Sequence, residues 1–125
     1  LVQLLLQNGA DVNAQGGFYG NALQAAADKG DEAIVELLLQ YKANVNAQGG
    51  LYGNALQAAS YSGHIAIVKI LIAHKANVNA QGGKYGSALQ AASCKGHEAI
   101  VNLLLENGAS VNAQGGEYSN ALQAA

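Results

Sequence analysis

The stretch that decides the fold is VNAQGGFYGNALQAA at 12–26, which returns with few changes at 45–59, 78–92 and 111–125. The copies are 33 residues apart and keep the same glycine pair, tyrosine and alanines. A fixed period of this size is typical of arrays in which small helical units stack to bury their apolar faces. The remaining residues of the chain lie before and between these copies, within the same 33-residue repeat.

Two short helices are predicted in each unit, and the first is rich in alanine. It follows Asn21, a favoured N-cap residue, with Gln24 three positions later. This spacing resembles a capping box, in which each of the two side chains bonds a free backbone amide at the helix start. The same pair recurs as Asn54/Gln57, Ser87/Gln90 and Asn120/Gln123.

A second, more apolar helix is predicted after the glycine that ends the first. Gly30, with its equivalents Gly63 and Gly96, suits the left-handed conformation found at helix ends. The second helix is predicted from Glu32 to Gln40, with apolar residues on more than one side and Glu36 facing water. Such a helix is covered by both its partner and the next unit, so single units should not be stable alone.

The second helices end in two different ways. Asn8-Gly9 and Asn107-Gly108 contain the glycine that a left-handed cap favours, whereas Tyr41-Lys42 and His74-Lys75 contain lysine. If all four ends share this conformation, each lysine should cost roughly 1 kcal/mol. The polar, glycine-containing segment that follows is predicted to form a projecting loop or hairpin.

The composition excludes several classes of protein. Charged residues are 11% and apolar residues 50% of the 125 residues, which favours stacked apolar helices over disorder. The net charge is −2 and every basic residue is a lysine, so no nucleic-acid binding is expected. The apolar run Ile65–Ala73 is too short to cross a membrane. Cys94 is the only cysteine, which favours an intracellular, cytoplasmic setting.

The repeat resembles the ankyrin repeat, over the whole chain. The residues that carry the resemblance are the ALQAA blocks, Gly-His at 63–64 and 96–97, Ile-Val at 34–35, 67–68 and 100–101, and Gly-Ala with Val-Asn-Ala at 108–113. The resemblance implies an all-α solenoid of helix-turn-helix units joined by loops or short hairpins. Where the family usually has Thr-Pro-Leu-His, this chain has Asn-Ala-Leu-Gln or Ser-Ala-Leu-Gln, which keeps the cap and loses the proline and histidine. The variant is similar to arrays in fungal proteins that join a nucleotide-triphosphatase module to repeats.

The repeat also predicts how the chain is divided. Complete units are expected at 16–48, 49–81 and 82–114, with partial units at 1–15 and 115–125. Neither end has the polar outer face that closes a self-standing array. We therefore expect a segment of a longer array, with additional repeats of the same parent chain at both ends.

A few positions differ between the copies, and these form the predicted partner-binding surface. Because stacking repeats the same contacts, positions that stay the same indicate scaffold. By resemblance to ankyrin arrays, the differing positions project into the concave groove. They are Phe18, Leu51, Lys84 and Glu117 in the loops, and Asp28, Lys29, Tyr61, Ser62, Cys94 and Lys95 at the ends of the first helices. The alternative is that they vary because nothing constrains them.

The repeated tyrosines have two interpretations. They could be a row of aromatic anchors for a partner, since tyrosine is favoured at binding hot spots. They could instead pack their rings against neighbouring loops and keep their hydroxyls in water. The lack of variation favours packing for Tyr19, Tyr52, Tyr85 and Tyr118.

No catalytic, metal or cofactor site is predicted. His64 and His97 have no cysteine or carboxylate at ligand spacing, so stabilisation of the turn is favoured over metal binding. Cys94 lacks a catalytic base and is expected to be an exposed thiol. The glycine pairs are not followed by the Gly-Lys-Ser/Thr of a phosphate-binding loop.

The sequence therefore predicts a non-catalytic protein–protein interaction module with an unidentified protein partner. The alternative is a structural spacer or a self-associating scaffold, in which nearly identical units supply length or stack end to end.

Overall fold

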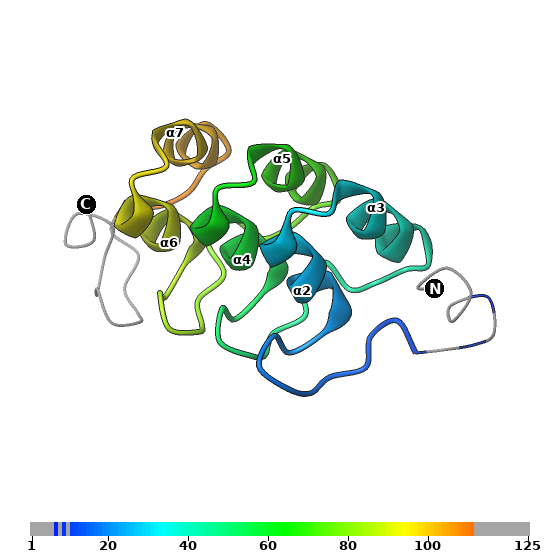
Figure 1. Ribbon diagram of the computed structural model, residues 1–125. Helices are drawn as coiled ribbons and strands as arrows, with labels where there is room; N and C mark the ends of the chain where they lie inside the picture. The colour runs from blue at the N-terminus through cyan, green and yellow to red at the C-terminus, as the bar shows by residue number, and fades with distance from the viewer. Residues whose placement is uncertain (1–6, 8, 10, 112–125) are drawn as a thin grey trace.

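The computed structural model describes residues 7, 9 and 11–111, and within them the chain folds into helix pairs stacked in one direction. The first helices of the pairs are α2 (Ala22–Lys29), α4 (Ala55–Ser62) and α6 (Ala88–Lys95). The second helices are α3 (Glu32–Gln40), α5 (Ile65–Ala73) and α7 (Glu98–Glu106). Figure 1 shows the two sets as parallel rows, with loops extending from the row of first helices. This arrangement confirms the predicted all-α solenoid.

The first helices begin where the N-cap residues predict. The side chains of Asn21 and Asn54 accept hydrogen bonds from the backbone amides of Gln24 and Gln57 at 2.9 and 2.8 Å. The second half of the predicted capping box is wrong. Gln24 Nε2 donates instead to the carbonyl of Ala47 at 3.5 Å, and Gln57 Nε2 makes the same contact one unit later. These buried glutamines therefore join neighbouring units instead of completing their own caps.

The glycines at the ends of the first helices have the predicted left-handed conformation, with φ values of 80°, 83° and 75° at Gly30, Gly63 and Gly96. Gly30 also leaves room for the next unit. A Cβ atom there would lie 2.7 Å from the ring of His64. Both backbone conformation and close packing therefore require glycine at this position.

The lysines that end the second helices are also left-handed. Lys42 and Lys75 have φ values of 68° and 70°, against 88° and 93° at the equivalent Gly9 and Gly108. An L-residue in this region is strained by contact between its Cβ atom and the backbone. All four ends therefore share one conformation, which is the condition for the expected cost of each lysine.

Lys42→Gly is expected to raise the free energy of unfolding by about 1 kcal/mol, because glycine has no Cβ atom to strain. Urea unfolding followed by circular dichroism measures the change. Lys69→Gly is the matched control, since Lys69 is exposed in the middle of α5 and should lose about 1 kcal/mol. An unchanged or lowered midpoint for Lys42→Gly would contradict the prediction.

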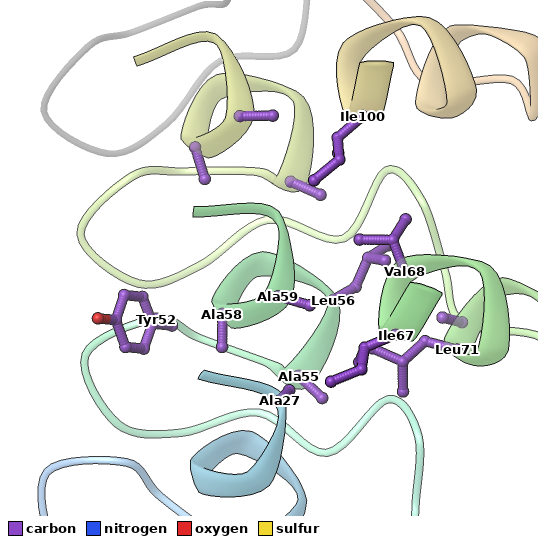
Figure 2. Packing of buried hydrophobic residues seen from close by; sticks show 14 of the residues in the cluster. Ala27, Tyr52, Ala55, Leu56, Ala58, Ala59, Ile67, Val68, Leu71 and Ile100 are labelled. Atoms are coloured by element: carbon purple, nitrogen blue, oxygen red, sulfur yellow. The ribbon is translucent and has the colours of Figure 1, made fainter. Parts of the chain in front are cut away.

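The apolar core lies between the two rows of helices and between successive first helices. Leu56, Ile67 and Leu71 are almost completely buried between α4 and α5, as Figure 2 shows. Alanines fill the space between α2 and α4, where Ala27 and Ala55 are at most 1% exposed. Small side chains allow these helices to approach closely, as the sequence predicted.

The segments before the first helices are short hairpins. In the first of them, the backbones of Gly16 and Gly20 form an antiparallel bridge, with the Gly16 amide donating to the Gly20 carbonyl at 2.7 Å. Equivalent bridges join 49 to 53 and 82 to 86. Each hairpin packs directly against the next, because a Cβ atom on Gly50 would lie 2.5 Å from the backbone carbon of Tyr19.

A repeated asparagine in the loop after each second helix joins one unit to the next. Asn46 Oδ1 accepts from the Asn77 amide at 2.7 Å, and Asn46 Nδ2 donates to the Lys75 carbonyl at 3.2 Å. Asn13 and Asn79 make the same two bonds to their following loops. We call these three residues the asparagine clamps.

Candidate functional site: a surface of hairpins and first helices

Nine of the ten predicted binding residues lie in the described part of the chain, and Glu117 lies outside it. The nine occupy two places in each helix pair. Three are at hairpin tips, and the others are in the last turn or at the end of a first helix. In chain order they are Phe18, Asp28, Lys29, Leu51, Tyr61, Ser62, Lys84, Cys94 and Lys95.

The three hairpin tips form a continuous row. The Leu51 amide donates to the Phe18 carbonyl at 2.9 Å, and the Lys84 amide donates to the Leu51 carbonyl at 2.9 Å. Their side chains differ in exposure: Phe18 is 60% exposed, Lys84 is exposed and Leu51 is half-buried against the core. The expected apolar contact at Leu51 is therefore only partly available.

The ends of the first helices are linked between units. Ser62 Oγ donates to Asp28 Oδ1 at 2.6 Å, which joins the end of α4 to the end of α2. Lys29 and Lys95 are exposed. Cys94 is half-buried and packs against the core, so the expectation of an exposed thiol is wrong.

Aromatic rings connect the tip row to the helix ends. The ring of Phe18 meets those of Tyr19 and Tyr52 edge-on, with centroids 5.0 and 6.5 Å apart. Tyr52 stacks between Tyr19 and Tyr85 at 6.4 and 6.3 Å, and Tyr61 stacks on Tyr85 at 4.4 Å. We call these five residues the aromatic strip; it crosses three hairpins and reaches α4.

The tyrosines of the strip differ in how much they contact water. Tyr52 and Tyr85 are 8% and 7% exposed, which confirms the packing interpretation for these two rings. In Figure 2 the Tyr52 ring lies apart from the aliphatic core. Tyr61 is half-buried, so little of its ring remains for a partner.

The hydroxyls of the buried tyrosines were predicted to stay in water, but that of Tyr52 is bonded to Asp28 and that of Tyr85 to Tyr61. Burial, the Asp28 charge and a hydrogen bond to Asp28 raise the pKa of Tyr52 to about 12. Burial and a hydrogen bond with Tyr61 raise the pKa of Tyr85 further. Both phenols are therefore neutral at physiological pH, and the negative charge of Asp28 is held by Ser62 and Tyr52.

Two lysines lie over the strip. Lys95 Nζ is 5.3 Å from the ring centroid of Tyr61, and Lys84 Nζ is 5.8 Å from that of Tyr85. At these distances an ammonium group is attracted to the negative face of the ring. The strip therefore combines apolar rings with positive charge at its edge.

The histidines join units. A ring nitrogen of His64 lies 2.9 Å from the Asp28 carbonyl, and His97 makes the same contact with the Tyr61 carbonyl at 3.0 Å. Neither caps its own helix, whereas Asp31 at the equivalent position accepts from the Ile34 amide. The histidines thus stabilise contacts between units, whereas the sequence predicted only that they stabilise their own turns.

Residues 7, 9 and 11–111 contain no group of three or more His, Cys, Asp or Glu side chains that could hold a metal ion. No helix within the same residues is long and apolar enough to cross a membrane.

Sequence reasoning left two interpretations open for Tyr19, Tyr52 and Tyr85 and favoured packing, because these residues do not vary between copies. It missed that their rings stack in one strip with Phe18 and Tyr61. Their spacing of 33 residues was the available signal, because equivalent residues in a stacked array lie side by side.

The comparisons with known proteins agree with this architecture. No curated protein shows significant similarity to the chain. The family model for ankyrin repeats in three copies matches residues 1–82 and, in a second match, 50–115. Together with the stacked helix pairs and their hairpins, this match shows that the chain belongs to the ankyrin repeat family.

Proposed function

We propose that this chain is a non-catalytic module that binds a partner protein on the concave surface made by its hairpins and first helices. Ankyrin repeats are generally protein–protein interaction modules. The observation that carries the proposal is the large exposed ring of Phe18, which lies on one surface with other residues that differ between copies. Exposed aromatic residues of this kind contribute strongly to protein binding.

The surface suits a binding role because it is already ordered. Backbone hydrogen bonds join the tips, ring stacking joins the hairpins, and the bond between Ser62 and Asp28 joins the helix ends. When a partner docks on this surface, few side chains of the surface remain to be immobilised, which reduces the entropy cost of association.

Capture from a lysate of the source organism tests this proposal. The double variant Phe18→Asp, Lys95→Glu should lose the protein that the unaltered chain retains. The control is Leu105→Asp, Lys69→Glu, which makes the same change in net charge at exposed residues of the second helices. Circular dichroism first establishes that both variants fold. Equal retention by the two variants would overturn the proposal.

A second candidate function is end-to-end self-association, which the near identity of the 33-residue units favours. If copies of the chain stack, sedimentation should show oligomers; a monomer at all concentrations would exclude this function.

Several finer predictions belong with this proposal. We infer that the units divide at 16, 49, 82 and 115, that further repeats of the parent chain flank the segment, and that it works inside the cell. The resemblance to fungal arrays fused to a nucleotide-triphosphatase module also stays a prediction. The full-length transcript of the parent protein would test all but the location, which imaging of the tagged protein would establish.

A further inference from the structure

We propose that the segment bound by the aromatic strip is an acidic peptide segment that also carries an aromatic or large aliphatic side chain. The proposal rests on the proposed function and adds the chemistry of the partner. Two features of the described residues lead to it: the distribution of charge between the two rows of helices, and the position of Phe18 relative to the lysines.

Charge is distributed unequally over the array. Among the described residues, the first helices and hairpins carry Lys29, Lys84 and Lys95 but only one carboxylate, Asp28; Glu117 lies outside these residues. The remaining carboxylates of the described residues lie in the loop before the first hairpin or on the second helices and their caps, at Asp11, Asp31, Glu32, Glu36, Glu98 and Glu106. The proposed binding surface is therefore positive although the whole chain has a net charge of −2.

The single carboxylate of this surface is already occupied. Asp28 accepts from Ser62 Oγ at 2.6 Å and from the Tyr52 hydroxyl. Lys84 and Lys95 lie over tyrosine rings, and neither forms an ion pair within the described part of the chain. Their ammonium groups keep donors available for a partner's carboxylates, and hydrogen bonds between two charged groups are stronger than those between neutral groups.

The exposed ring of Phe18 is the reason why we expect the bound peptide to carry an apolar side chain. This ring is held edge-on by Tyr19 and Tyr52, yet remains 60% exposed at the end of the strip. Adjacent tips are hydrogen-bonded like neighbouring strands, so they are spaced by about 5 Å. Lys84 is two tips from Phe18, a distance that about three residues of an extended peptide span. We therefore expect an apolar residue and an acidic residue about three positions apart.

The test is selection of a phage-displayed library of random short peptides on the immobilised chain. The expected result is enrichment of net-acidic sequences with an aromatic or large aliphatic residue at that spacing. The enriched peptide should bind the double variant Lys84→Gln, Lys95→Gln about tenfold more weakly than it binds the unaltered chain. The single variant Phe18→Ser should weaken binding by about the same factor. Lys69→Gln, on the second helices, should bind it as the unaltered chain does.

Several outcomes would overturn the proposal. These are enrichment of neutral or basic peptides, failure to enrich any peptide, and a loss of binding in Lys69→Gln as large as in the double variant Lys84→Gln, Lys95→Gln. A single-stranded oligonucleotide bound as tightly as the selected peptide, with the same lysine dependence, would identify a polyanion site instead. If the Phe18→Asp, Lys95→Glu variant loses its captured protein but the selection shows no acidic preference, the proposed function stands and only this inference fails.

Discussion

Gly50→Ala is expected to lower the free energy of unfolding by about 3 kcal/mol, one of the two largest effects predicted for this chain. Gly50 has a φ of 69°, where an added Cβ atom is strained by roughly 1 kcal/mol. The same atom would lie 2.5 Å from the Tyr19 backbone carbon and 2.7 Å from the Phe18 carbonyl oxygen. These are backbone atoms, so the two hairpins must separate, and overpacking of this kind costs about 1–3 kcal/mol.

Gly17→Ala is the matched control for this substitution. Gly17 occupies the same position in its hairpin with a φ of 74°, but nothing lies within 4 Å of its added Cβ atom. Urea unfolding of both variants separates the conformational strain, which they share, from the collision between hairpins. Equal losses in the two variants would show that the hairpins do not pack as described.

Leu104→Ala is expected to lower the free energy of unfolding by about 3 kcal/mol, since burial is lost and a cavity remains. Within α7, Leu104 is fully buried, whereas the adjacent Leu105 is 40% exposed. Leu105→Ala removes the same atoms from the same helix and should cost less than about 1 kcal/mol.

The same unfolding experiment measures both leucine variants. A change in midpoint without a change in the denaturant slope would show that stability alone is altered. Similar losses for Leu104→Ala and Leu105→Ala would contradict the assignment of the buried and exposed sides of α7.

The local parts of this fold could be predicted from the sequence because short-range geometry determines them. Asn21 and Gly30 bound the first helix as their residue types require, and the left-handed Lys42 follows from its equivalence to Gly9. Each of these depends on the backbone within a few residues. The N-cap bond of Asn21, for example, spans three positions.

Contacts between units were not predictable in the same way. Gln24 has the spacing of a capping residue, but its side chain reaches Ala47, 23 positions away. The spacing alone cannot distinguish these two uses, because the choice depends on how closely the next unit packs. For the same reason the stacking of Tyr61 on Tyr85 of the following hairpin was not predicted.

The asparagine clamps have a consequence for how such an array can change in length. Each clamp has its two partners in the loop of the following unit, and for Asn13 and Asn46 that loop carries the next clamp. A tandem duplication of one 33-residue segment would therefore create a copy whose clamp bonds already fit both neighbours. These bonds need no compensating substitution when gene duplication lengthens the protein.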